Sequence, residues 1–434
     1  MKRIEWSAMD DTTRAQLLTR PTRSLAAGVK ARVEEVMADV AARGDVALRV
    51  LTEHYDSVRL EAFEVDAAER AAAVAAVGPA LRAAIEEAAS RIDAFHRAGM
   101  PRAYALDTAP GVRCERVLRP ISPVGLYVPA GSAPLPSTAL MLAIPAQLAG
   151  CGEIVLCTPP RRDGSADPAV LVAATYAPNA RIFKLGGAQA IAAMSLGTAS
   201  VPRCEKLFGP GNAWVDEAKR QASERPDGPA IDMPAGPSEV LVIADGTQDP
   251  DWVAIDLLSQ AEHDESAQAL LVTPDAAFGR AVAAAVEARL ATLPRRSIAA
   301  ASWAANGAII TVRDLAEAAA LSNRIAPEHL EILTEDPEAV AADCLHAGAI
   351  FLGPWTPEAV GDYVGGPNHV LPTARSARFS SGLNVLDFMK RTTLARMTPE
   401  ALKAIGPAAE TLAASEGLQA HGLSVRARLD RLNR

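Results

Sequence analysis

The chain has 434 residues, more than one compact core usually holds, which predicts at least two domains. Hydrophobic residues make up 49% of it and charged residues 22%, a balance that excludes a disordered or fibrous protein. The formal net charge is −9 and no run is rich in lysine or arginine, which argues against a nucleic-acid-binding protein.

The N-terminal residues 1–20 contain no apolar core of signal-peptide length, and no apolar stretch is long enough to span a bilayer. Five cysteines without a CxxC pair argue against a disulfide framework and favour a reducing compartment. We therefore expect a cytoplasmic protein without membrane contact.

Helical spacing of apolar residues runs through 22–99 and predicts helices there. From about residue 120, short apolar runs alternate with helical stretches. Strands are expected at 124–128, 153–157 and 181–185, and helices at 137–149, 168–175 and 188–196. This alternation predicts a parallel sheet with helices on both faces.

A glycine- and proline-rich loop at 209–237 is expected to separate this unit from a second one with the same alternation. There, strands are expected at 240–244, 269–273, 308–312, 330–333 and 349–352, and helices at 250–262, 276–291, 313–323 and 337–345. The alternation stops after about residue 375, and 398–416 is predicted to be a helix. The basic ending VRARLDRLNR has too few apolar residues for a core of its own, so it must pack on something, such as another subunit.

Two polar pairs are candidates for chemistry. Gln260 and His263 lie three positions apart at the end of an expected helix and share one face, which suits two metal ligands or one ligand and one substrate contact. Glu328 and His329 lie on a turn that enters the strand 330–333, and together offer two acid/base groups. The alternatives are a solvated helix end and a pair of surface residues.

Two later segments add further candidates. Asp362 and His369 lie in GDYVGGPNHVLPT, where three glycines and two prolines force a shaped loop. Glu416 and His421 lie in EGLQAHG beside a helix end, which alone is unremarkable. Two imidazoles and two oxygen ligands, from Gln260, His263, Asp362 and His421, would suit zinc with an open substrate position.

A dinucleotide site has no obvious fingerprint, because no GxGxxG follows any expected strand. LGGAQAIAA (185–193) and FGPGNAWVDEAKRQ (208–221) each join a turn to a helix N-terminus, where free N–H groups attract anions. These segments do not separate NAD from another phosphate compound, and tight turns without a ligand are the alternative.

Nine segments resemble, in order, the signature segments of the histidinol dehydrogenase family, and the resemblance extends over nearly the whole chain. They are PVGLYVPAG (123–131), GGAQAIAA (186–193), FGPGN (208–212), DMPAGPSEVLV (232–242), LLSQAEHD (257–264), APEHLEI (326–332), GDYVGGPNHVLPT (361–373), FSSGLNVLDF (379–388) and EGLQAH (416–421).

The resemblance implies one zinc ion per subunit, bound by Gln260, His263, Asp362 and His421. It implies NAD contacts at Tyr127, Gln189 and Asn212. It implies substrate contacts at Ser238, Gln260, His263, His329, Asp362, His369, Glu416 and His421, and an acid/base pair formed by Glu328 and His329. The implied reaction is the NAD-dependent oxidation of L-histidinol to L-histidine through L-histidinal, the last step of histidine biosynthesis.

The same resemblance implies a homodimer in which the C-terminal arm supplies Glu416 and His421 to the partner's site. The expected fold is α/β, with two parallel-sheet, Rossmann-like domains that lack GxGxxG. The expected divisions are a helical segment (1–25), a first α/β domain with most of the zinc and catalytic site (26–122 and 238–376), a second with the NAD contacts (123–237), and a dimerisation arm (377–434).

Two alternatives stay open. A family member acting on another small alcohol, such as a sulfonated diol, would need a cationic pocket, whereas Glu328, Asp362 and Glu416 favour a substrate with an amine and an imidazole. A non-catalytic metal- or nucleotide-binding protein with the same fold would lose nothing when Glu328 or His329 is replaced.

Overall fold

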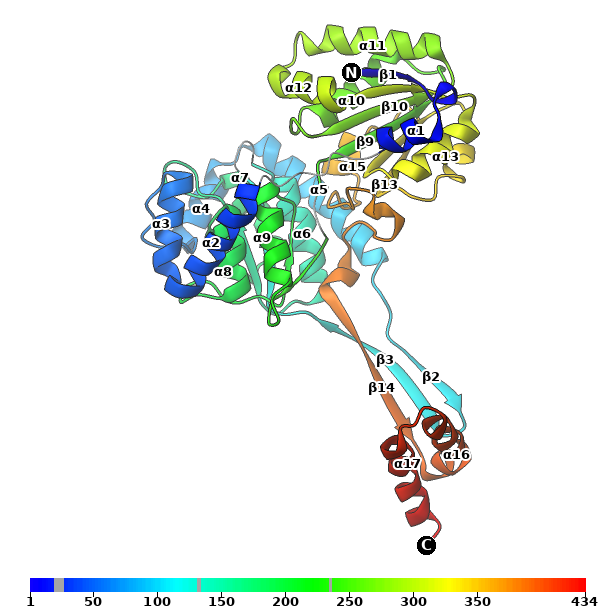
Figure 1. Ribbon diagram of the computed structural model, residues 1–434. Coiled ribbons are helices and arrows are strands. Elements are labelled where there is room, and N and C mark those ends of the chain that lie inside the picture. The colour runs from blue at the N-terminus through cyan, green and yellow to red at the C-terminus, as the bar shows by residue number, and fades with distance from the viewer. Residues whose placement is uncertain (19–26, 131–133, 234–235) are drawn as a thin grey trace. The chain divides into compact units, whose positions relative to one another are not determined.

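The computed structural model describes residues 1–18, 27–130, 134–233 and 236–434 of the chain (Figure 1). Of the expected features, residues 19–25 of the N-terminal segment, Gly131 and Pro234–Ala235 lie outside the described residues. The chain forms two compact units. The main unit comprises Met1–Gly99 and Ser122–Phe388, and the small unit comprises Met100–Ile121 and Met389–Arg434.

A six-stranded parallel sheet, in the order β1-β11-β10-β9-β12-β13, organises one part of the main unit. Its strands are β1 (Lys2–Glu5), β9 (Glu239–Ala244), β10 (Gln268–Thr273), β11 (Ala308–Thr311), β12 (His329–Leu333) and β13 (Ala349–Leu352). The helices of this part are α1 (Asp11–Leu18), α10 (Pro250–Ala261), α11 (Ala276–Leu290), α12 (Arg296–Asn306), α13 (Leu315–Ile325), α14 (Pro337–Ala341) and α15 (Glu358–Tyr363).

Both faces of this sheet are buried, because successive residues of a strand point to opposite sides and both sets are mainly apolar. Val240 and Val242 of β9 pack with α10, α11 and α12, while Leu241 and Ile243 pack with α13 and α14. The helix α10 begins as its sequence predicts, since the Asp249 side chain accepts the N–H of Asp251 and Pro250 occupies the first turn.

A five-stranded parallel sheet, in the order β6-β5-β4-β7-β8, organises the other part of the main unit. Its strands are β4 (Val124–Tyr127), β5 (Ile154–Thr158), β6 (Ala180–Lys184), β7 (Lys206–Phe208) and β8 (Ala230–Ile231). The helices around it are α2 (Ala27–Arg43), α3 (Asp45–Asp56), α4 (Ala67–Ala76), α5 (Pro79–Ala98), α6 (Pro136–Ala149), α7 (Pro168–Ala174), α8 (Gly187–Leu196) and α9 (Ala213–Ser223).

The helices of residues 27–98 pack on this second sheet. The apolar face of α2, with Val33, Val36 and Val40, joins a core that contains Val155 and Phe183. The helix α5 lies against α6, and α4 against α7. These contacts contradict the expected grouping of 26–122 with 238–376, because an amphipathic helix does not reveal in its sequence which of two apolar sheets covers it.

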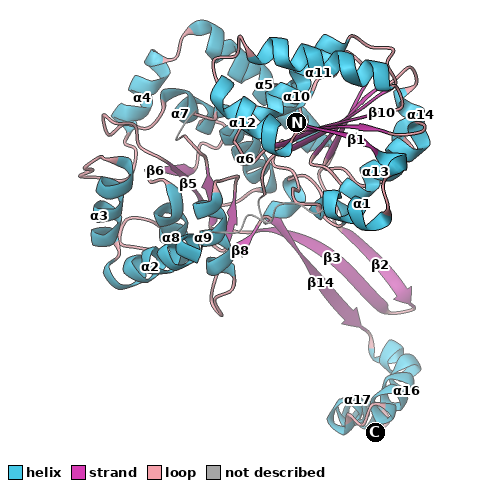
Figure 2. Ribbon diagram, turned by 45° about the horizontal axis from the view of Figure 1, so that its top comes forward, coloured by secondary structure: helices cyan, strands magenta, loops and turns pink. Residues whose placement is uncertain are grey.

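The small unit contains an antiparallel sheet that the sequence analysis missed (Figure 2). Its strands β2 (Tyr104–Ala109), β3 (Val112–Pro120) and β14 (Met389–Met397) are followed in the chain by α16 (Pro399–Ser415) and α17 (Gln419–Leu432), which pack on each other. Large apolar side chains stay exposed here, including Leu412 at 63% and Leu423 at 64%. This exposure agrees with the expectation that the C-terminal segment cannot form a core alone.

The predicted α/β alternation with parallel sheets is confirmed, with three further corrections. Residues 2–5 form a strand instead of a helix, since they pair with β11 and bury Ile4. The expected loop 209–237 contains α9, and the sequence analysis did not predict α12 or α15. All five cysteines are free thiols. None of the helices described here combines the length and apolar character that crossing a membrane requires.

Candidate active and metal site

The predicted catalytic residues lie at the amino edge of the six-stranded sheet. His329 is the first residue of β12 and pairs in register with Val240, the second residue of β9, and with Ala349, the first of β13. The end of α10, with Gln260, immediately precedes the segment that enters β10. In contrast, Gly187 and Asn212 follow the carboxyl ends of β6 and β7 in the five-stranded sheet. The two sheets therefore present opposite strand ends to the candidate sites.

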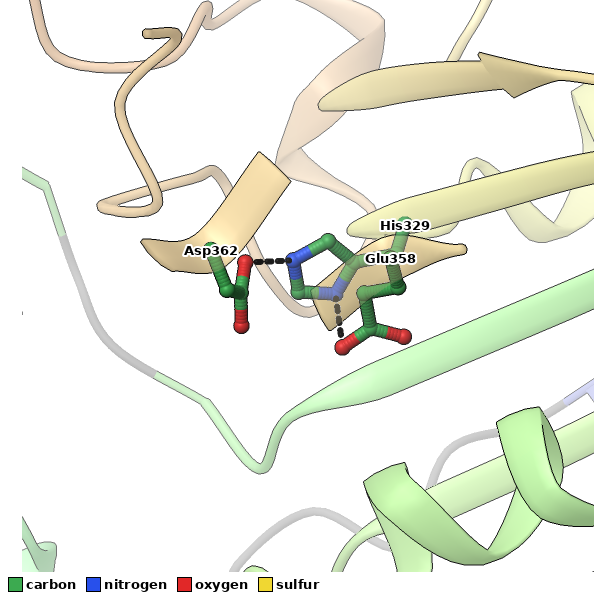
Figure 3. A group of neighbouring side chains, drawn as sticks. All are labelled: His329, Glu358 and Asp362. Atoms are coloured by element: carbon green, nitrogen blue, oxygen red, sulfur yellow. Dashed lines mark ion pairs between the residues drawn. The ribbon is translucent and has the colours of Figure 1, made fainter. Parts of the chain in front are cut away.

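The His329 imidazole lies between carboxylates of α15 (Figure 3). Its Nε2 is 3.3 Å from Asp362 Oδ1, and its Nδ1 is 3.4 Å from Glu358 Oε1. Glu358 and Asp362 are four residues apart, so one helix face carries both. Nδ1 also lies 3.2 Å from the Glu239 carbonyl oxygen, which places the proton on Nδ1. Nε2 faces the Asp362 carboxylate, an acceptor for a second ring proton.

Charges around His329 set the protonation of the whole cluster. Burial acts to lower the pKa of His329, but Glu358, Glu328 and Asp362 outweigh it and hold this pKa well above its ordinary range. Burial raises the pKa of Glu358 to about 7, with His329 opposing the shift. Burial also opposes ionisation of Asp362, yet His329 keeps the pKa of Asp362 below its ordinary value. Asp362 is thus the carboxylate of this cluster that is best suited to hold a cation.

Glu328 is buried beside His329, and a backbone N–H donates to its carboxyl group. The N–H of Glu239 donates to Glu328 Oε2 at 2.9 Å, and His329 Nδ1 is 3.9 Å from the same oxygen. Burial raises the pKa of Glu328 to about 8. A carboxyl group with a pKa near neutrality is suited to accept a proton from water and to release it again.

The predicted metal ligands of the main unit fit a cation in their chemistry. The Gln260 side chain is fully buried, and neither its Oε1 nor its Nε2 has a hydrogen-bond partner among the described residues. A buried amide without partners costs free energy unless something binds it. His263 is exposed to solvent, yet desolvation by surrounding protein atoms lowers its pKa. The negative charge of Asp362 opposes this shift. Neutral imidazole, carboxylate and amide oxygen form a zinc-compatible set.

His369 is held inside the chain by both ring nitrogens. Nδ1 lies 2.9 Å from the Asp362 carbonyl oxygen, and Nε2 lies 2.9 Å from the Thr138 hydroxyl. The ring therefore orients the residue that carries the Asp362 carboxylate. A substrate that bonds to Nε2 of His369 would have to replace Thr138.

A cavity of about 90 Å³ joins Glu328 to the FGPGN loop. Glu328, Ser238 and His369 line it together with Gly209 and Lys219. Only glycine fits at position 209, because φ is +119° and a Cβ atom would lie 2.1 Å from the Tyr127 carbonyl oxygen. The loop thus packs closely against the end of β4.

A second cavity, of about 260 Å³, lies at the start of α8 and α9. Gln189 and Asn212 line it, together with Tyr55, Asp56 and Trp214. Asp56 Oδ2 accepts a hydrogen bond from Gln189 Nε2 at 3.2 Å, and burial raises the pKa of Asp56 to about 6. Asn212 caps α9 by accepting the N–H groups of residues 214 and 215. Two helix starts at one cavity suit a phosphorylated ligand.

Tyr127 lies behind this second cavity. Its side chain is buried, and its hydroxyl accepts the N–H of Gly187 at 3.0 Å. Tyr127 therefore supports the first turn of α8.

The two remaining predicted residues, Glu416 and His421, belong to the small unit. Glu416 ends α16, His421 lies in the first turn of α17, and both are exposed in the single chain.

The sequence analysis missed Glu358 and Asp56 as site residues. The spacing of Glu358 and Asp362 after Pro357 is a helix-start signal that could have revealed Glu358. No sequence signal marked Asp56, because its partner Gln189 is 133 positions away.

Comparisons with known proteins identify the family of this chain. Residues 18–429 match the model of the histidinol dehydrogenase family. The chain is 59% identical to a histidinol dehydrogenase of Cereibacter sphaeroides over 93% of both chains, and 54% identical to one of Xanthomonas euvesicatoria over 99% of both. The crystal structure of histidinol dehydrogenase from Elizabethkingia anophelis superposes with a TM-score of 0.95 at 42% identity, covering 100% of this chain and 99% of that one.

Proposed function

The chain belongs to the histidinol dehydrogenase family, and we propose that it oxidises L-histidinol to L-histidine through L-histidinal, with two NAD⁺ reduced. The observation that carries this proposal is the buried Glu328–His329 pair, in which His329 lies next to Asp362 and Glu328 lines one cavity with the FGPGN loop. This arrangement offers a proton acceptor for each oxidation. The sulfonated-diol alternative is less well supported, since the carboxylates at this site would repel an anionic substrate.

We propose that Gln260, His263 and Asp362 bind a zinc ion together with His421 from the small unit. The buried, unpartnered amide of Gln260 supports this assignment. When bound, zinc would supply positive charge that orients the amino alcohol and offsets the Asp362 carboxylate. That offset matters because Asp362 is one of the groups that raise the pKa of His329, and His329 must be neutral to accept a proton.

In the first oxidation, Nε2 of His329 accepts the hydroxyl proton as hydride leaves the substrate carbon towards NAD⁺. The Nδ1–H bond to the Glu239 carbonyl holds the ring in the tautomer that this step needs. In the second oxidation, Glu328 takes a proton from water as the water oxygen attacks the aldehyde carbon. Hydride then leaves that carbon towards a second NAD⁺. Burial of both residues limits loss of the aldehyde to solvent.

Purified protein mixed with NAD⁺ and L-histidinol tests the activity. We expect two NADH per histidine formed and no turnover of a sulfonated diol. Turnover of the diol without turnover of L-histidinol would contradict the proposed substrate.

Removal of metal is expected to abolish this activity while the fold persists, because both parallel sheets have complete apolar cores without a metal. Dialysis against a chelator, followed by addition of zinc, should remove and then restore NADH formation. Circular dichroism should stay unchanged throughout. Full activity in protein with less than one zinc per ten subunits would contradict the metal assignment.

We propose that NAD binds at the second cavity, with Gln189 and Asn212 as contacts and Tyr127 supporting the turn beneath. The exposed rings of Tyr55 and Trp214 can stack on a flat base at this cavity. The Asp56 carboxylate would accept hydrogen bonds from the ribose hydroxyls of NAD⁺. It would repel the phosphate that replaces one of these hydroxyls in NADP⁺.

Asp56→Asn is therefore expected to raise the ratio of kcat/KM for NADP⁺ to that for NAD⁺ by about 10-fold to 100-fold, because a like-charge repulsion disappears. Steady-state kinetics with both cofactors at pH 8 measures this ratio. Glu53→Gln is the matched control, since it removes the same charge from the exposed side of the same helix. An unchanged ratio in Asp56→Asn would contradict the role of Asp56.

We further propose a cytoplasmic homodimer in which α16 and α17 of one subunit supply Glu416 and His421 to the other. The exposed leucines of the small unit and the exposure of both polar residues support this arrangement. No nucleic-acid or membrane partner is proposed.

A further inference from the structure

A pair of carboxyl groups lies behind the catalytic cluster, outside the proposed chemistry. Glu331 is two residues after His329 on β12, so both side chains lie on the same face of the strand. Glu331 is completely buried. Its Oε1 accepts the backbone N–H of Glu358 at 2.6 Å, and its carboxyl group interacts electrostatically with that of Asp256.

These two contacts connect three elements that carry residues of the candidate metal and catalytic site. Glu331 shares β12 with His329. The N–H of Glu358 opens α15, which also carries Asp362. Asp256 lies on α10, one helical turn before Gln260.

The helix α15 needs such an anchor. It has six residues, and a helix this short is not stable in isolation. Its first residues have N–H groups without partners inside the helix, and Pro357 at the cap position makes no side-chain hydrogen bond to them. Glu331 supplies the missing acceptor from the neighbouring strand.

We propose that Glu331 is a positioning residue that fixes α15 and α10 on β12 and thereby holds Glu358 and Asp362 against the His329 imidazole. The inference deepens the proposed function and rests on it for its kinetic consequences. The structural part, that the Glu331 acceptor orders α15, is independent of substrate and metal.

Two replacements of Glu331 separate its acceptor from its volume. Glu331→Gln keeps a carbonyl oxygen for the Glu358 N–H and can donate to Asp256. Glu331→Met fills similar space without an acceptor. We expect Glu331→Met to lower kcat and zinc affinity by about 10-fold to 100-fold with little change in the KM for NAD⁺, and Glu331→Gln to stay within about threefold of wild type.

Hydrogen exchange of the backbone amides in residues 356–365 provides a readout that needs neither turnover nor metal. Faster exchange in metal-free Glu331→Met, with near-wild-type exchange in Glu331→Gln, is the expected result. Glu217→Met is the matched control, because Glu217 is also buried but pairs with Arg220 on α9. It should lower the melting temperature without changing exchange in 356–365.

Equal behaviour of Glu331→Met and Glu331→Gln, in exchange or in kcat, would overturn the proposal. If Glu331→Met does not fold, Asp256→Ala and Asp256→Asn test the same pair from α10, with loss expected only in the alanine variant. An inactive wild type with the expected exchange pattern would reject the proposed function and leave the role of Glu331 intact.

Discussion

Glu328→Gln is expected to slow the conversion of L-histidinal to L-histidine by about 10²-fold to 10⁴-fold, the usual contribution of a general base. The glutamine oxygen can still accept the N–H of Glu239, so the local structure should persist. A neutral amide does not take a proton from water, however. The oxidation of L-histidinol to the aldehyde needs only His329 and should be much less affected.

Single-turnover kinetics with each substrate distinguishes the two steps. With L-histidinol, Glu328→Gln should produce a rapid first NADH and a very slow second one. With L-histidinal, only the slow phase should remain. His329→Asn is the control, because it should impair the first oxidation directly. Equal losses in both half-reactions of Glu328→Gln would contradict the water-activating role.

The pH dependence of the second oxidation follows from the same carboxyl group. Burial raises the pKa of Glu328 to about 8, so its basic form becomes dominant only above that pH. The rate of the aldehyde-to-acid step should rise with pH and level off above about 8. A pH profile of that step measures this, and a rate that is flat between pH 6 and 9 would contradict it.

The free energy of unfolding should decrease as pH rises, whereas the rate of the second oxidation increases. A carboxyl group whose folded-state pKa is raised stabilises the fold below its unfolded pKa, and this contribution is lost as pH rises towards about 8. Glu328→Gln removes that dependence. The variant is therefore expected to melt at a higher temperature than the wild type at pH 9.

The order of strands and helices was accessible from the sequence because each β-α repeat buries its own apolar face. The packing partner of α2 was not, since Val33, Val36 and Val40 would suit either sheet. The antiparallel sheet of the small unit was not predicted, because β14 pairs with β3 across more than 260 positions.

The site was predictable only in part, because some of its residues are close together in the sequence and others are far apart. Glu328 and His329 are adjacent in sequence, and Gln260 and His263 share a helix end. Gln260 and His421 became candidates only through their order among family-like segments. The structure adds the unpartnered amide of Gln260 as an independent reason, whereas the proposed role of His421 requires a second subunit.

Mixed dimers test that dependence on a second subunit. Glu328→Gln changes the main unit, and His421→Ala changes the small unit. Each variant alone is expected to be nearly inactive. If His421 acts in the partner's site, a heterodimer of the two variants contains one site with both changes and one intact site. Random pairing of equal amounts makes half of the dimers mixed, so about a quarter of the wild-type activity should return.

The same experiment tests the alternative arrangement, in which His421 acts within its own chain. If His421 acted within its own chain, each site of the heterodimer would carry one change, and mixing would restore nothing. Co-expression with two different affinity tags isolates the heterodimer for NADH assays. A mixture of Glu328→Gln with His329→Asn is the matched control, because both changes lie in the main unit. It should stay inactive under either arrangement, so recovery in the first mixture alone would assign His421 to the partner's site.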